Sequence, residues 1–152
     1  KTVLFDGIIA RINLGDNLST GASHFFNEVL RVKHLAELLA SGKRMFVLMD
    51  ELFKGTNHRD ASEATLELVN GLKEYDNSVF LLSSHITEIC PILQKECVAQ
   101  KHLEVQLDEK AGLIFTYQLL DGVAEEKLGM WLLRKEGVFE ILRKVNFEAG
   151  QN

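Results

Sequence analysis

Five consecutive apolar residues followed by two acids constrain this chain more than any other feature of its sequence. The run covers Met45–Met49 (Met-Phe-Val-Leu-Met) and leads directly into Asp50 and Glu51. A stretch that is apolar at every position predicts a fully buried strand, which is typical of the centre of a parallel sheet. Acids that follow such a strand lie at the carboxyl edge of the sheet, where open α/β folds bind their ligands.

The remaining patterns alternate between helix and strand. A helical period of apolar residues predicts a helix over about His24–Ala40. A second helix is expected to start at Asp60, because Asp60 and Glu63 form a capping pattern. Val79–Leu82 predicts a second buried strand, and this order favours an α/β fold with a mostly parallel sheet flanked by helices. The other expected elements are a strand-like run over Thr2–Phe5, a short helix over Thr87–Gln94, a hairpin whose strands centre on Leu103–Leu107 and Leu113–Tyr117, and two helical stretches near Glu125–Arg134 and Val138–Lys144.

Composition narrows the classes of function. The chain has 152 residues, of which 46% are hydrophobic and 26% charged, and this suits one domain or most of one. The net charge of −5 provides no basic surface for direct nucleic-acid binding. No apolar run approaches the roughly 20 residues of a membrane span, and no secretory signal is visible. Cys90 and Cys97 lack the neighbours of a metal site, so we expect reduced thiols in a cytoplasmic protein.

A small set of side chains is able to carry chemistry. Asp50 can hold Mg²⁺, usually through water, and Glu51 can orient or deprotonate an attacking water. The second strand ends in Ser83-Ser84-His85, and adjacent parallel strands end side by side, so His85 is expected near both acids. A histidine there can donate a hydrogen bond to a γ-phosphate oxygen. Taken alone, the acidic pair favours a structural interpretation, because many strands end in acids that serve solvation and capping.

Several segments, in order, resemble the MutS family of DNA mismatch repair ATPases. The family typically reads L-x-D-E-L/I-G-R-G-T-S-x-x-D-G at its Walker B and D-loop, G-x-S-T-F-M-x-E at its signature, and A-T-H-x-x-E further on. The matching segments here are Leu48–Asp60, Asp16–Glu28, and Leu82–His85 with Glu88; Phe5–Ile12 is similar to the stretch before the signature, and Phe115–Gly122 with Gly129 is similar to the late hairpin.

The resemblance implies roles for individual residues and a pair of cofactors, ATP and Mg²⁺. It implies that Asp50 supports Mg²⁺, that Glu51 is the catalytic glutamate, and that His85 faces the γ-phosphate. It further implies that Gly21 and Ser23 reach the nucleotide of a partner subunit, and that Thr56, Asn57 and Asp60 form the D-loop that joins the two sites. A helix start at Ser23 would also suit phosphate binding. The alternative for Ser23 and Asp60 is N-capping, worth about 1 kcal/mol each.

The chain also differs from the family pattern, in its lack of a phosphate loop and at several single positions. No G-x-x-x-x-G-K-[ST] phosphate loop occurs in the chain. Because the family carries that loop before its signature, we expect a single partial domain over residues 1–152, the C-terminal portion of a three-layer P-loop NTPase fold of the ATP-binding-cassette type, with negligible activity by itself. Phe53 stands where Gly is usual, and His24, Ala61, Lys127 and Leu128 also differ, which suggests a divergent branch.

Three functions remain open at this point. The first is the ATPase module of a MutS-like protein that forms a homodimer, contacts DNA through its other domains, cooperates with other repair proteins and needs no membrane. The second is another ATP-binding-cassette ATPase, of a transporter or of chromosome maintenance. Transporters usually carry L-S-G-G-Q, whereas this chain has Ser-Thr-Gly-Ala-Ser over residues 19–23. The third is a non-catalytic dimerisation module derived from such a cassette.

Overall fold

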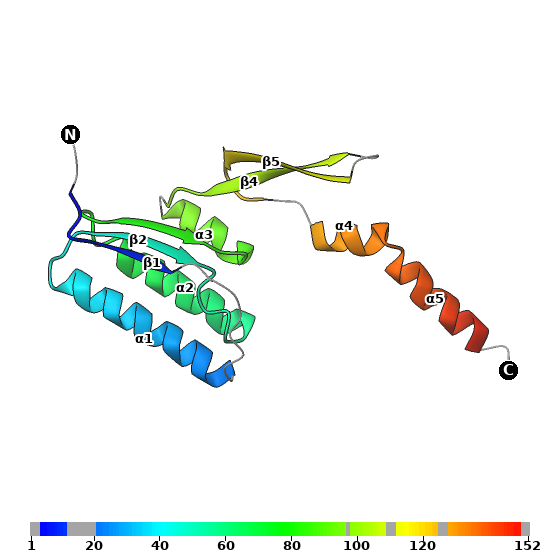
Figure 1. Cartoon of the computed structure of the whole chain (residues 1–152), viewed down its shortest axis with the longest axis horizontal. Coiled ribbons are helices and arrows are strands. Elements are labelled where there is room, and N and C mark those ends of the chain that lie inside the picture. Colours follow the sequence, from blue (N-terminus) through cyan, green and yellow to red (C-terminus); the bar gives the residue numbers. More distant parts are fainter. Residues whose placement is uncertain (1–3, 12–20, 97, 109–111, 125–127, 150–152) are drawn as a thin grey trace. The chain divides into compact units, whose positions relative to one another are not determined.

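The computed structural model describes residues 4–11, 21–96, 98–108, 112–124 and 128–149 of the chain (Figure 1). The chain divides into two compact units, Lys1–Val98 and Ala99–Asn152.

The first unit is built on a parallel three-stranded sheet. Its strands are β1 (Gly7–Arg11), β2 (Met45–Asp50) and β3 (Val79–Ser83), in the order β1-β2-β3. The apolar run of β2 therefore takes the central position, as its sequence predicts. The register pairs Ile9 with Val47, and it pairs Asp50 with Ser83 at the end of the two strands. This pairing places the ends of β2 and β3 at one edge of the sheet.

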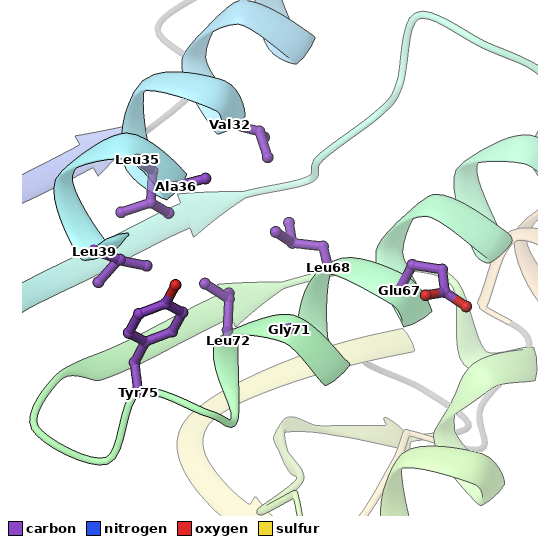
Figure 2. A pocket seen from close by; sticks show the side chains of 9 residues that line it. All are labelled: Val32, Leu35, Ala36, Leu39, Glu67, Leu68, Gly71, Leu72 and Tyr75. Atoms are coloured by element: carbon purple, nitrogen blue, oxygen red, sulfur yellow. The ribbon is translucent and has the colours of Figure 1, made fainter. Parts of the chain in front are cut away.

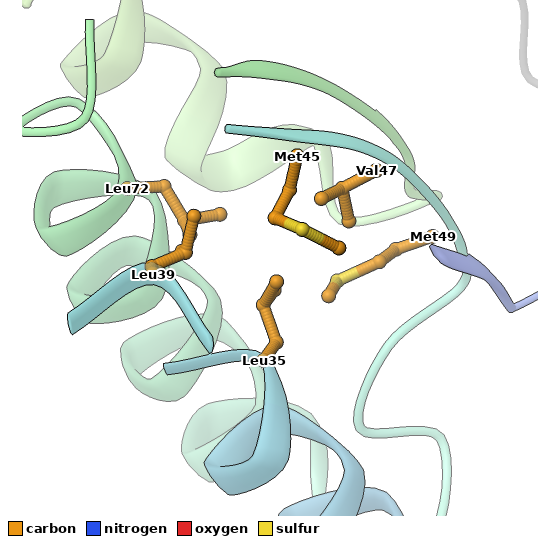
Figure 3. Packing of buried hydrophobic residues seen from close by; sticks show 6 residues of the cluster. All are labelled: Leu35, Leu39, Met45, Val47, Met49 and Leu72. Atoms are coloured by element: carbon orange, nitrogen blue, oxygen red, sulfur yellow. The ribbon is translucent and has the colours of Figure 1, made fainter. Parts of the chain in front are cut away.

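Two helices cover one face of this sheet. Helix α1 (Gly21–Ala40) and helix α2 (His58–Leu72) lie side by side (Figure 1), and both contribute to the main core. Alternate side chains of β2 point into that core, where they meet leucines from the two helices (Figure 3). The buried members of this cluster are Leu35, Leu39, Met45, Val47, Met49 and Leu72.

A second apolar cluster lies beneath the segments that follow β2 and β3. The 3-10 helix η1 (Thr87–Ile89) and helix α3 (Cys90–Lys95) follow β3, in agreement with the short helix predicted there. Their apolar side chains pack with α2 and with the loop after β2. The buried members are Phe53, Ala61, Val69, Ile86, Ile89 and Leu93.

The opposite face of the sheet is largely exposed in the described residues. Ile8 is 71% exposed and Leu81 is 55% exposed, whereas Phe80 and Leu82, which face the helices, are half-buried. The prediction that Val79–Leu82 is a buried strand is therefore wrong, because Val79 and Leu81 are exposed and the other two residues are only half-buried. The reason is that the described helices of this unit pack on one side only, so side chains that alternate across β3 have different environments.

The starts of three elements differ from the sequence-based prediction. The main chain of Asp6 donates to the Arg44 carbonyl at 2.8 Å, and its carboxylate accepts from the Arg44 N–H at 2.8 Å. Regular pairing with β2 therefore begins at Gly7, and the predicted strand over Thr2–Phe5 is wrong at Leu4 and Phe5; residues 2 and 3 lie outside the described part. The hydrogen bond from the Arg44 N–H, followed by that from its guanidinium, lowers the pKa of Asp6.

Both long helices begin earlier than predicted. Helix α1 starts at Gly21, so Ser23 lies inside its first turn and is not the residue that precedes the helix. Helix α2 starts at His58, and its N-cap is Asn57, whose side chain accepts from the Asp60 N–H. N-capping by Ser23 or Asp60 is therefore incorrect, because each residue already has a helical position.

The second unit consists of a hairpin followed by two helices. Strands β4 (Lys101–Asp108) and β5 (Gly112–Asp121) pair antiparallel, with a bulge near Leu103, and confirm the predicted hairpin. Helices α4 (Leu128–Lys135) and α5 (Val138–Ala149) confirm the two predicted helical stretches; residues 125–127 of the first prediction lie outside the described part. Among the described helices, none has the length and apolarity needed to cross a membrane.

Candidate functional site

The two acids after β2 are fixed by the neighbouring strand. Asp50 and Ser83 are register partners, and the Ser83 hydroxyl donates a hydrogen bond to the Asp50 carboxylate. The Glu51 N–H donates to the Ser83 carbonyl at 3.1 Å and approaches the Ser83 hydroxyl at 3.3 Å. Ser83 thus orients one acid through its side chain and the other through its main chain.

The Glu51 carboxylate lies between two basic groups. His85 Nδ1 is 3.7 Å from Glu51 Oε1, and the Lys54 ammonium forms an ion pair with Glu51 Oε2. The predicted proximity of Glu51 and His85 is therefore present in the structure. The sequence analysis did not predict Lys54, although its position three residues after Glu51 in a short loop was the available signal.

A second pair of histidine and carboxylate side chains lies beside the first. His58 Nε2 is 3.2 Å from the Glu88 carboxylate, which connects the start of α2 to the 3-10 helix after β3. The pKa of Glu88 is lowered, chiefly by a hydrogen bond from its own main-chain N–H and further by His58 and His85. Glu88 therefore remains ionised at neutral pH and adds a negative charge next to the His85 imidazole.

The loop between β2 and α2 has an unusual backbone. Glu51 has a φ of 47° and Phe53 a φ of 61°, and both values lie in the left-handed region that favours glycine. For a bulky residue such as Phe53 this conformation costs roughly 1–2 kcal/mol. Phe53 is only 5% exposed, and full burial of such a side chain contributes about 1.5–3 kcal/mol. Burial of the ring therefore offsets the strain at Phe53.

The same loop lies directly against the beginning of α1. The rings of Phe53 and Phe25 are 6.2 Å apart in an edge-to-face arrangement at 62°. A Cβ added at Gly55 would lie 2.9 Å from Phe25 Cβ and 3.0 Å from its main-chain N, so only glycine allows this approach. The contact brings the loop to within one turn of Gly21 and Ser23, whose backbone forms the start of α1.

The end of the loop is stabilised by a reciprocal cap. Asn57 Oδ1 accepts from the Asp60 N–H at 3.0 Å, and Asn57 Nδ2 donates to Asp60 Oδ2 at 2.7 Å. The Thr56 N–H points back to the Phe53 carbonyl at 3.4 Å. The structure thus gathers Thr56, Asn57 and Asp60 in one turn, while their assignment to a D-loop that reaches a partner remains a prediction.

The donor set at the sheet edge is suited to one kind of metal ion. Among the described residues no group of three or more His, Cys, Asp or Glu side chains converges as a complete metal cage. Asp50 and Glu51 offer carboxylate oxygens next to each other, and Mg²⁺ commonly binds through one or two carboxylates while keeping several waters. The chemistry of the two residues therefore fits Mg²⁺ better than zinc or a calcium cage.

An apolar groove also occurs in the first unit, but in a different place. It has a volume of about 240 Å³ and lies between α1 and α2, where the side chains of both helices face one another (Figure 2). Neither the two acids after β2 nor His85 lines it. The groove is therefore separate from the candidate site. Its lining residues are Val32, Leu35, Ala36, Leu39, Glu67, Leu68, Gly71, Leu72 and Tyr75.

The fold and this site define an α/β protein whose central parallel strand presents an acidic pair at its carboxyl end. The chain belongs to the MutS domain V family, and the model of this family matches residues 1–146. It is 30% identical over 157 residues to the DNA mismatch repair protein MutS of Aquifex pyrophilus, an alignment that covers 97% of this chain and 18% of that protein.

Two further relatives carry the same name. The DNA mismatch repair protein MutS of Halalkalibacterium halodurans is 26% identical over 136 residues, covering 89% of this chain and 15% of that protein. The DNA mismatch repair protein MutS of Bacillus subtilis is 27% identical over 128 residues, covering 84% of this chain and 15% of that protein. The chain thus spans less than a fifth of the length of the three relatives.

Proposed function

We propose that this chain is part of the ATPase module of a DNA mismatch repair protein of the MutS type, and that it hydrolyses ATP with Mg²⁺ in the full-length protein. The observation that carries the proposal is the Glu51 carboxylate beside His85 at the carboxyl edge of the sheet. In a member of the MutS domain V family, this is the place and the chemistry expected of a water-activating pair.

The roles of the individual side chains follow from their contacts. Asp50 accepts from Ser83 with one oxygen and keeps its other oxygen for the hydration shell of Mg²⁺, which when bound neutralises charge on the phosphates. Glu51 takes a proton from the attacking water as general base. His85 faces Glu51 through Nδ1, so Nε2 is the nitrogen that can donate to a phosphate oxygen.

The proposal includes a second subunit. In a homodimer, Gly21 and Ser23 at the start of α1 would approach the nucleotide bound by the partner, because a helix N-terminus attracts phosphate. The turn that contains Asn57 and Asp60 would lie between the two nucleotides. DNA and other repair proteins would be bound by other parts of the full-length protein, in the cytoplasm and without a membrane.

The proposal also includes the architecture of the whole ATPase domain. We infer a three-layer P-loop NTPase architecture of the ATP-binding-cassette type, with the phosphate-binding loop supplied by the full-length protein. The exposed apolar face that contains Ile8 and Leu81 supports a further layer, since soluble proteins rarely leave such a face uncovered. Phe53, in a position where the family usually has glycine, supports a divergent branch.

The decisive experiment compares Glu51→Gln with wild type in the full-length protein. We expect ATP binding to be retained and turnover to fall by roughly 10²- to 10⁴-fold, the usual contribution of a general base. Glu74→Gln is the matched control, because Glu74 is an exposed acid that follows α2 and is not part of the site. Turnover at the wild-type rate in Glu51→Gln would remove the proposed role.

A titration with Mg-ATP separates this function from a non-catalytic dimerisation module. Ligand that binds only the native state raises the unfolding temperature in proportion to the logarithm of its excess over Kd. In the full-length protein we expect this rise for the wild type and a smaller rise for Asp50→Asn when Mg²⁺ is limiting. A melting temperature that does not respond to Mg-ATP would favour the dimerisation module.

A further inference from the structure

The loop between β2 and α2 is held at two points only a few residues apart. At its start, the Glu51 N–H is bonded to the Ser83 carbonyl of β3. In its middle, the Phe53 ring packs on Phe25 of α1, and the Gly55 backbone touches the same residue. The five residues from Glu51 to Gly55 therefore connect the sheet edge to α1, and this segment is held at its first and its last residue.

Phe53 keeps a strained backbone conformation in this arrangement. A φ of 61° is free of strain for glycine, but it is unfavourable for phenylalanine. The aromatic ring is buried in the cluster that contains Ala61 and Ile86, and it contacts Phe25 edge to face. A residue held in a strained conformation next to a candidate site indicates that the surrounding packing determines its geometry.

We propose that Phe53 is a positioning residue, which fixes the Glu51 carboxylate next to His85 and joins it, through Phe25, to the first turn of α1. This inference rests on the proposed function. In the proposed dimer, Glu51 serves one nucleotide, whereas Gly21 and Ser23 serve the nucleotide of the partner. The Phe53–Phe25 contact is then the connection through which one chain relates its two nucleotide contacts.

The first test measures the contact without using catalysis. In the full-length protein, the amides of Glu51 and Thr56 report on the loop, because their hydrogen bonds end on Ser83 and Phe53. In Phe53→Ala we expect both amides, and the helix-bonded amides of Phe25 and Phe26 in α1, to exchange roughly tenfold faster, since local opening determines the exchange rate. Unchanged exchange at α1 would overturn the proposed connection.

Gly55→Ala provides an independent perturbation that leaves Phe53 intact. The added methyl group would meet the backbone of Phe25, so we expect the same pattern of faster exchange. Gly71→Ala is the matched control, because a Cβ at Gly71 meets nothing within 4 Å. Phe53→Leu keeps an apolar side chain in place and is expected to restore most of the protection, which also covers the case that Phe53→Ala does not fold.

The second test uses the kinetics of ATP hydrolysis. We expect kcat to fall roughly ten- to a hundredfold in Phe53→Ala with little change in KM, because small displacements of a catalytic group have effects of this size. The double variant Phe25→Ala/Phe53→Ala should be no slower than the slower single variant, whereas additive losses would overturn the inference.

The two proposals fail in different ways. Wild-type kcat in Phe53→Ala, together with loss of turnover in Glu51→Gln, would overturn the positioning role and leave the proposed function in place. Full turnover in Glu51→Gln would overturn the proposed role of Glu51 as general base, while the exchange measurements would still decide whether the loop and α1 are connected.

Discussion

Replacement of Asn57 tests whether this residue only caps a helix or also serves a nucleotide site. Its Oδ1 atom accepts from the Asp60 N–H at 3.0 Å, and loss of an N-cap of this type costs about 1 kcal/mol. This free energy corresponds to a roughly fivefold change in an equilibrium constant. In Asn57→Ala we therefore expect the Asp60 amide to exchange roughly fivefold faster, as measured by hydrogen exchange and nuclear magnetic resonance.

Asn57→Ser then separates the two roles. Serine caps helices about as well as asparagine, so it should restore the protection of the Asp60 amide. If Asn57 also contributes to a nucleotide site, Asn57→Ser restores stability but not the rate of ATP hydrolysis in the full-length protein. If Asn57 only caps the helix, Asn57→Ser restores both the stability and the rate of ATP hydrolysis. An Asp60 amide that exchanges equally fast in wild type and Asn57→Ala would refute the reasoning.

Two further outcomes follow from packing and charge. Leu35 is 1% exposed in the main core, so Leu35→Ala should lower the free energy of unfolding by roughly 2–5 kcal/mol. Leu30→Ala, on the exposed side of the same helix, should change it by less than about 0.5 kcal/mol. Urea unfolding of the chain measures both changes. The Lys73 ammonium, 2.7 Å from Glu96, lowers the pKa of that carboxyl below its ordinary value of 4.5. Because the folded-state pKa is the lower one, the pair stabilises the fold above pH 4.5 and the contribution is lost as the pH falls through the folded-state pKa. Lys73→Met should make stability less dependent on pH in this acidic range, and an identical acid profile would contradict the assignment.

The position of the acids was predictable because it depends on a simple rule. An apolar run predicts a central strand, and parallel neighbours end at the same edge. These two statements bring Glu51 close to His85 without knowledge of any other contact, and the structure has the two side chains 3.7 Å apart. The sequence pattern therefore predicted the parallel direction of the two strands and the edge of the sheet at which they end.

The start of α2 was not predictable from the same reasoning. Asn57 and Asp60 are both good N-cap residues, and each is followed three positions later by an acid, Asp60 and Glu63. The sequence pattern fits either start. The extended backbone of Asn57, with φ −69° and ψ 156°, selects the earlier one.

The contacts within the loop depend on tertiary packing. Nothing in the local sequence indicates that Phe53 adopts a left-handed backbone, since propensity argues against it. The conformation is set by the cluster into which the ring packs, and that cluster contains residues from α1, α2 and the segment after β3. Likewise, apolar residues on both sides of β3 predict burial on both, whereas coverage depends on which elements lie nearby.

The backbone of Glu51 restricts the choice of inactive variants. With a φ of 47°, the position tolerates glutamine or asparagine but strongly disfavours valine, isoleucine or threonine, whose branched Cβ crowds the adjacent main chain. A β-branched replacement would change the backbone conformation of the turn. A loss of activity in such a variant would therefore say nothing about proton transfer. Mutational scans across this turn should therefore be interpreted by side-chain shape first and by charge second.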